Sequence, residues 1–137
     1  MDFTDTTEEA EYRAGVRAWL HENAEPKRPG RTFNVKYGAD DLVPLAKEWQ
    51  AKKFAAGYAG ITMPREYGGQ GGSQLKQIVY SQEESNFVTP RGVYEIGLGM
   101  CIPTMLTYAT EAQKTRYAVP ALEGTEIWCQ LFSEPSA

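Results

Sequence analysis

Two adjacent carboxylates, Glu83 and Glu84, are the residues of this chain that come nearest to an acid–base pair. Two carboxylates can share proton transfer when burial raises the pKa of one of them. Successive residues of a helix, however, point in directions roughly 100° apart, so neighbours do not face one common ligand. We therefore interpret the pair as one packed or ion-paired glutamate beside one solvated glutamate.

Glycines gather in Gly68-Gly69-Gln70-Gly71-Gly72, a composition that could cradle a phosphate group. A P-loop continues into Gly-Lys-Ser/Thr at the start of a helix, and no lysine directly follows these glycines. A dinucleotide fingerprint needs a βαβ unit around the glycines, and the sequence predicts none. We interpret the cluster instead as positions of positive φ and of close approach between helices.

The remaining candidates for chemistry are isolated. His21 is the sole histidine, and Cys101 and Cys129 are the only cysteines. A metal site needs three or four converging ligands, and a nucleophilic serine or cysteine needs a basic partner. The residues alone therefore predict no metal site and no complete catalytic constellation.

The length, net charge and composition of the chain exclude several classes of protein. A length of 137 residues corresponds to one domain, and the net charge of −4 argues against nucleic-acid binding. The longest apolar stretch, residues 96–109, is too short to span a bilayer. The first residues are acidic and polar, unlike a secretory signal, and two unpaired cysteines suit a reducing compartment, so we expect a cytoplasmic protein.

Apolar spacing predicts a helix-rich chain. Thr6 and Glu9 have capping-box spacing at the start of the first helix, and Thr110 and Gln113 have it at the start of the last. Residues 25–39 are predicted to be an irregular connection. The fourth helix is apolar on nearly every side, as in a central helix. The first predicted helix starts near Thr6 and is stopped by Pro26, the second runs from near Asp40 to Gly57 and Gly60, and three more cover about 73–87, 94–109 and 110–122. The predicted buried stripes are Tyr12, Val16, Trp19 and Leu20; Leu42, Leu45, Ala46 and Trp49; and Leu75, Ile78 and Val79.

The chain ends on an alternating, aromatic, strand-like run, residues 127–137. A strand at a chain end has no partner for its backbone groups, so we expect more chain or another subunit to complete a sheet there. The predicted fold class is all-α: a bundle of five to six helices over residues 1–124, followed at 125–137 by the first strand of a truncated β domain. If the chain ends at Ala137, we expect an exposed apolar face around Trp128, Leu131 and Phe132.

Three stretches together resemble the N-terminal part of acyl-CoA dehydrogenases, and they cover almost the whole chain in the family's order. The third contains the Cys-Gln-Leu-Phe-Ser-Glu-Pro that opens the family's middle β domain. Ala109 and Ala112 depart from the family's usual Gly and Glu, and neither change touches chemistry. The stretches are Gly57-Tyr-Ala-Gly-Ile-Thr-Met-Pro-Arg-Glu-Tyr-Gly-Gly-Gln-Gly-Gly-Ser73, Pro103-Thr-Met-Leu-Thr-Tyr-Ala-Thr-Glu-Ala-Gln-Lys-Thr-Arg-Tyr117 and Glu126-Ile-Trp-Cys-Gln-Leu-Phe-Ser-Glu-Pro-Ser-Ala137.

This resemblance implies an FAD-dependent enzyme that desaturates an acyl-CoA between its α and β carbons. In the family a glutamate removes the α proton, the flavin accepts the β hydride, and electrons pass to an electron-transfer flavoprotein. The family's fold adds a β middle domain and a helical C-terminal bundle, usually within a tetramer, here a homo- or hetero-tetramer. The catalytic glutamate comes from that C-terminal domain, so no residue of this chain is assigned the role, and the chain alone is expected to be inactive.

The resemblance also assigns binding residues. Gln130, Phe132, Ser133 and Ser136 match the strand and loop beside the flavin, with the Ser133 hydroxyl near flavin N5. The acyl wall is matched by Glu95, Leu98, Gly99 and Ile102.

Gly97 and Gly99 would either leave room for a bulky, branched or ring-bearing acyl group or serve helix packing. A non-catalytic subunit or interaction module of the same ancestry is the alternative function. An enzyme subunit in a complete assembly would purify with flavin, whereas a helical module alone would be colourless.

Overall fold

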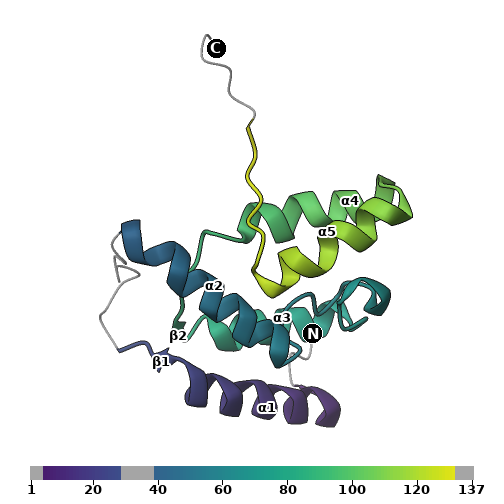
Figure 1. Cartoon of the computed structure of the whole chain (residues 1–137). Helices are drawn as coiled ribbons and strands as arrows, with labels where there is room; N and C mark the ends of the chain where they lie inside the picture. The colour runs from purple at the N-terminus through teal and green to yellow at the C-terminus, as the bar shows by residue number, and fades with distance from the viewer. Residues whose placement is uncertain (1–4, 29–38, 132–137) are drawn as a thin grey trace.

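The structure is a computed structural model that describes residues 5–28 and 39–131. Two long helices and three shorter ones make up most of it, in agreement with the predicted helical bundle (Figure 1). Helix α1 packs on α3, α2 on α5, and α4 on α5. The elements are α1 (Thr7–Asn23), β1 (Glu25–Pro26), α2 (Ala39–Ala55), the 3₁₀ turn η1 (Arg65–Tyr67), α3 (Gln74–Glu84), β2 (Phe87–Val88), the π-helical turn η2 (Gly97–Cys101), α4 (Ile102–Tyr108) and α5 (Glu111–Glu123).

Both predicted capping boxes are present. The Thr6 backbone N–H donates to the Glu9 carboxylate at 2.7 Å, and the Glu9 N–H donates to the Thr6 hydroxyl at 3.3 Å. Thr110 and Gln113 make the same reciprocal pair at the start of α5. These bonds satisfy backbone N–H groups that have no partner within a helix, and so they fix where each helix begins.

The helices enclose two apolar clusters. One lies between α1, α2 and α3, and the stripe predicted for the first helix contributes to it. The other lies between η1, α4 and α5, with Trp128 from the following segment packed against it. The first cluster contains Val16, Leu20, Trp49, Ile61, Tyr80 and Phe87; the second contains Tyr67, Ile102, Ala118 and Ala121.

The glycine-rich segment 57–73 folds back on itself between the two clusters. The N–H groups of Gln70, Gly71 and Gly72 donate to the carbonyls of Gly60, Met63 and Ile61. Gly68 and Gly71 have positive φ, as the sequence predicts. A Cβ on Gly68 would lie 3.0 Å from Val119 of α5, so the interpretation of these glycines as positions of positive φ and close approach is confirmed.

Several local expectations were wrong. Leu45, Leu75 and Ile78 are exposed, so the stripes predicted for α2 and α3 are narrower than expected. The fourth helix is not buried all round, since Met100 and Tyr108 are exposed. Its first part is the π-helical turn η2. A π turn widens the helix by one residue and breaks the 3.6-residue period that the prediction assumed.

Two further differences concern short segments. Part of the predicted irregular connection is strand β1, which pairs antiparallel with β2 through Glu25 opposite Val88 and Pro26 opposite Phe87. Within residues 127–131 no strand forms, because no second chain segment pairs with it there. The rest of the predicted strand, 132–137, lies outside the described residues.

Glu83 joins α3 to α1 through two arginines. Its carboxylate accepts from Arg17 at 2.8 and 2.9 Å and from Arg13 at 3.1 Å, while Arg13 also holds Asp5. The Glu83 side chain is only 6% exposed. Hydrogen bonds from Arg17 first, and from Arg13, hold the pKa of Glu83 below its usual value of 4.5. Glu83 is therefore the ion-paired glutamate of the predicted pair, with a structural task.

We expect Glu83→Gln to lower the free energy of unfolding by about 1.5–3 kcal/mol at neutral pH, because the arginines lose a charged acceptor. A lowered folded-state pKa stabilises the fold above the unfolded pKa, and this contribution is lost as the pH falls through the folded pKa. Urea unfolding should therefore show a flatter acid limb below pH 4.5 in the variant. Glu22→Gln, an exposed change on α1, is the matched control. Equal losses in both variants would contradict the role of Glu83.

Candidate functional site

A cleft of about 220 Å³ lies between α2 and the segment 89–98. Helix α2 lines it with side chains one and two turns apart, and the end of α3 contributes Glu84. Two of the predicted acyl-wall residues, Glu95 and Leu98, belong to its lining. The other lining residues are Ala46, Trp49, Gln50, Lys53, Thr89, Pro90, Arg91, Gly92 and Tyr94.

Glu84 is held at the edge of this cleft by two hydrogen-bond donors and one ion-pair partner. Its carboxylate accepts from the Trp49 indole at 3.1 Å and the Tyr80 hydroxyl at 3.0 Å, and Arg91 lies 3.8 Å away. Burial, with the charge of Glu84 next, raises the pKa of the Tyr80 hydroxyl, which stays a donor. The expectation that one glutamate of the pair would be solvated was therefore wrong: both carboxylates are engaged, because α3 packs on α1 through one face and toward α2 through the next.

The C-terminus of α5 supports the other side of the cleft lining. The Gln50 side-chain amide donates to the Leu122 carbonyl at 2.8 Å, and the Tyr94 hydroxyl donates to the Gly124 carbonyl at 2.6 Å. Gly124 has a φ of +85°, and a Cβ there would lie 2.9 Å from Gln50. These contacts fix α2 and Tyr94 against the same helix end, so the lining is positioned by three helices.

Lys53 is not among the residues that the sequence analysis singles out, although a signal for it exists. It follows Ala46 and Trp49 at helical spacing, on the stripe that faces inward. Lysine is seldom buried without a paired group, so a lysine on an apolar stripe indicates an ammonium group that binds a partner or a ligand. Desolvation lowers the pKa of the Lys53 ammonium, and the nearby charges are Glu84, Arg91 and Glu95.

The four predicted acyl-wall residues do not share one environment. Glu95 is exposed, Leu98 is half-buried, and both line the cleft. Gly99 is exposed, and a Cβ added to it would have no atom within 4 Å. Ile102 is fully buried in the cluster with Tyr67 and has no surface open to a ligand. The structure thus brings Glu95 and Leu98 together and places Ile102 in the core.

Gly97 and Gly99 have different surroundings. A Cβ on Gly97 would lie 3.1 Å from the Cβ of Trp128, so this glycine serves close packing of the segment after α5. Trp128 also meets Tyr117 edge-on, with ring centroids 5.3 Å apart. Of the two glycines, only Gly99 has open space around it. For Gly97, the structure favours helix packing over room for a bulky acyl group.

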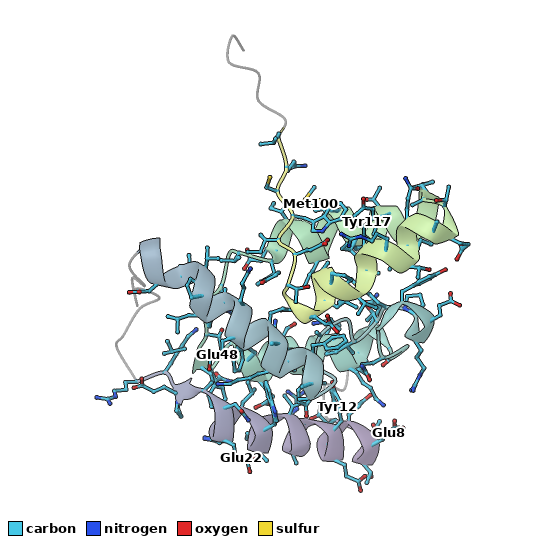
Figure 2. All side chains as sticks on the ribbon, viewed as in Figure 1. Glu8, Tyr12, Glu22, Glu48, Met100 and Tyr117 are labelled. Carbon is cyan, nitrogen blue, oxygen red and sulfur yellow. The ribbon has the colours of Figure 1, made fainter. Side chains whose placement is uncertain are left out.

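The segment after α5 runs past α4 and away from the helices (Figure 1), and Tyr117, labelled in Figure 2, contacts Trp128 of this segment. Gln130 is half-exposed, and Leu131 is 90% exposed, as expected for the predicted apolar face. Trp128 is half-buried instead, because it packs against α5. Phe132, Ser133 and Ser136 lie outside the described residues, so their predicted flavin contacts stay predictions.

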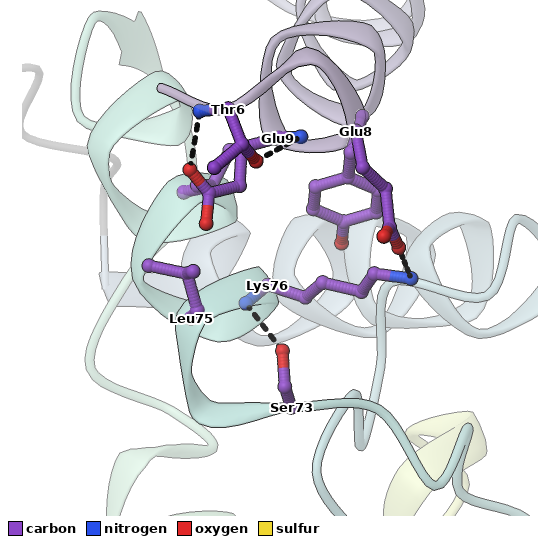
Figure 3. Close-up of a pocket in the computed structure, with 8 residues that line it drawn as sticks. Thr6, Glu8, Glu9, Ser73, Leu75 and Lys76 are labelled. Carbon is purple, nitrogen blue, oxygen red and sulfur yellow. Dashed lines mark hydrogen bonds and ion pairs between the residues drawn. The ribbon is translucent and has the colours of Figure 1, made fainter. Parts of the chain in front are cut away.

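A smaller hollow of about 120 Å³ lies between α1 and α3 (Figure 3). Its polar groups are already paired: Thr6 with Glu9, the Ser73 hydroxyl with the Lys76 N–H, and the Lys76 ammonium with Glu8 at 3.5 Å. The Lys76 ammonium also lies 5.5 Å from the Tyr12 ring centroid. These pairs cap the two helices and join them to each other.

Residues 6–125 match the family model described as "Acyl-CoA dehydrogenase, N-terminal domain". The chain belongs to the acyl-CoA dehydrogenase family. It is 30% identical to "Acyl-CoA dehydrogenase IpdE1" of Mycolicibacterium smegmatis over 93% of this chain and 33% of that protein. It is 29% identical to "Acyl-CoA dehydrogenase, short-chain specific" of Clostridium acetobutylicum over 100% of this chain and 34% of that protein.

Solved structures agree with the fold. The "Tcur3481-Tcur3483 steroid ACAD" superposes with a TM-score of 0.69 at 25% identity, over 100% of this chain and 34% of that one. The ChsE4-ChsE5 complex from Mycobacterium tuberculosis superposes with a TM-score of 0.67 at 22% identity, over 90% of this chain and 30% of that one. The chain spans about a third of the length of the relatives that it matches. None of the helices in the described ranges is long and apolar enough to cross a membrane.

Proposed function

We propose that this chain forms the N-terminal helical domain of a flavin-dependent acyl-CoA dehydrogenase, which desaturates an acyl-CoA thioester between its α and β carbons. The observation that carries this proposal is the family match over residues 6–125, in which Glu95 and Leu98 line an open cleft. The chain supplies binding surface, and the catalytic glutamate belongs to a domain beyond it. Electrons leave to an electron-transfer flavoprotein.

In this proposal Glu95, Leu98 and Gly99 contact the acyl group, and Ile102 supports their helix from the core. The residues that would hold the flavin of an FAD cofactor are Gln130, Phe132, Ser133 and Ser136. Within the described part, the half-exposed Gln130 side chain fits such a role, because no other side chain holds its amide. When bound, the flavin supplies the acceptor for the β hydride. The Ser133 hydroxyl would donate a hydrogen bond to that flavin and so stabilise the charge that develops on it.

A ring-bearing acyl group is the substrate class that we favour. The open space at Gly99 supports it, and so does the likeness to a solved protein that is named a steroid ACAD. The names of that protein and of the ChsE4-ChsE5 complex each join two components, which supports assembly with a second kind of subunit. Free cysteines, with Cys129 exposed, suit a reducing compartment such as the cytoplasm.

The test is anaerobic spectroscopy of the native assembly that contains this chain. We expect flavin to co-purify, and its absorbance to bleach when a ring-bearing acyl-CoA is added, with weaker bleaching by butyryl-CoA. A colourless assembly would overturn the enzyme proposal and favour the second candidate, a non-catalytic subunit that shapes a partner's pocket. Bleaching by butyryl-CoA alone would keep the enzyme and overturn the ring-bearing substrate.

A further inference from the structure

We propose that the cleft between α2 and residues 89–98 binds a carboxylate at the distal end of the acyl group, with Lys53 as its main partner and Arg91 as the second. This inference rests on the proposed function and adds to it a substrate class: acyl-CoA thioesters whose acyl group ends in a carboxylate. The ammonium group of Lys53 is the feature that points to it.

Lys53 differs from every other half-buried lysine in the described ranges. Lys27 and Lys76 have polar partners, and Lys114 holds Glu111 at 2.9 Å. The side chain of Lys53 alone among them makes no hydrogen bond or ion pair within 4 Å there, although its ammonium is largely desolvated. Its neighbour Lys52 points to solvent and pairs with Glu48 at 2.7 Å. A buried cation without a close counter-ion gains more from an arriving anion than a solvated one does.

The carboxylates of the cleft do not neutralise Lys53 directly. Glu84 already accepts from Trp49 and Tyr80 and pairs with Arg91. Glu95 is exposed and forms no ion pair within the described part of the chain. Both attract the ammonium from beyond contact distance. The position next to Lys53 is therefore open for an anion, and Arg91, 44% exposed and only loosely held by Glu84, can turn toward the same anion.

The lining selects an organic anion over an inorganic one. Ala46, Trp49, Pro90 and Leu98 contribute apolar surface beside the two cations. The cleft measures about 220 Å³, whereas a single water needs roughly 10–15 Å³ of the same kind of space. Apolar walls with a few fixed polar groups are typical of sites for small organic molecules. Because Leu98 and Glu95 also belong to the proposed acyl wall, one acyl group can contact them and reach Lys53.

The test compares octanoyl-CoA with suberoyl-CoA, which differs from it by a terminal carboxylate, by calorimetric titration of the intact assembly at neutral pH. We expect suberoyl-CoA to bind about 10- to 100-fold more tightly, as for a hydrogen-bonded charged pair. In Lys53→Met, which keeps the length of the side chain, this ratio should fall to near one. Lys53→Arg should restore part of it. Lys52→Met removes the same charge one residue away and should leave the ratio unchanged.

The outcomes separate the two proposals. If both thioesters bind equally well to the unmodified protein, or if the ratio survives Lys53→Met, the carboxylate site is wrong and the acyl-CoA proposal stands. If neither thioester binds, the carboxylate site is wrong, and the acyl-CoA proposal fails with it only if a ring-bearing acyl-CoA does not bind either. Thermal unfolding checks that Lys53→Met is folded, and we expect no loss of stability because the change removes a desolvated charge.

Discussion

Ile102→Ala should lower the free energy of unfolding by about 2–5 kcal/mol. Ile102 has no exposed surface and packs in the cluster with Tyr67, Ala118 and Ala121. Removing three methyl or methylene groups there forfeits their transfer free energy and leaves a cavity between α4, α5 and η1. Family resemblance assigned Ile102 to the acyl wall, which would predict the opposite pattern: a change in acyl-CoA affinity with little change in stability.

A graded series makes this test decisive. Ile102→Val removes one methylene group and should cost about 0.5–1.5 kcal/mol. Met100→Ala, on the exposed side of the neighbouring turn, should cost less than about 1 kcal/mol. Denaturant unfolding followed by circular dichroism gives the energies, and thioester titration gives the affinities. Stability near that of the unmodified protein in Ile102→Ala, with acyl-CoA affinity reduced, would place the side chain in the acyl wall after all.

Local features of this fold were predictable because their causes are local. A capping box needs only residues three positions apart, so Thr6 with Glu9 and Thr110 with Gln113 were predicted with their bonds. The glycine crossing at 57–73 was predictable in kind, since several successive glycines have few other uses. The apolar stripe predicted for α1 is confirmed, because that helix packs through one continuous face.

The predictions fail where a segment distant in the sequence determines whether a residue is buried or paired. One glutamate of the pair Glu83 and Glu84 was expected in solvent, but the Trp49 indole, 35 positions away, donates a hydrogen bond to Glu84. Leu75 and Ile78 belong to the same predicted apolar stripe as Val79, yet only Val79 of these three is buried. The short β1–β2 pair joins segments that carry no strand pattern, since two residues are too few for one. A π turn at Gly97–Cys101 has no periodicity of its own to detect.

In the candidate site, too, some features were predictable from the sequence and others depend on contacts between distant segments. Glu95 and Leu98 were found through the resemblance, and the structure adds that they share a cleft with Lys53. Spacing on α2 could have indicated Lys53, because position 53 continues the inward stripe of Ala46 and Trp49. That its ammonium lacks a close partner could not be predicted, because it depends on where α3 directs Glu84 and where residues 89–95 run.

Gly69→Ala should destabilise the fold by about 2–4 kcal/mol, although Gly69 does not have positive φ. A Cβ there would lie 2.6 Å from the Met63 Cβ and closer still to the Met63 carbonyl. That carbonyl accepts from the Gly71 N–H at 2.8 Å, so moving it away from the new methyl group also breaks a bond that closes the crossing. The cost is thus a backbone displacement plus a hydrogen bond, which no side-chain rotation can relieve.

Gly15→Ala is the matched control for this prediction. Gly15 lies in the exposed middle of α1, with no atom within 4 Å of a Cβ placed on it. The same added methyl group should therefore stabilise the protein by about 0.5–1 kcal/mol, because alanine loses less backbone entropy in a helix. Urea midpoints of the two variants should move in opposite directions. A Gly69→Ala protein as stable as the unmodified one would show that the crossing tolerates a side chain, and that the glycine at this position reflects something other than contact between backbones.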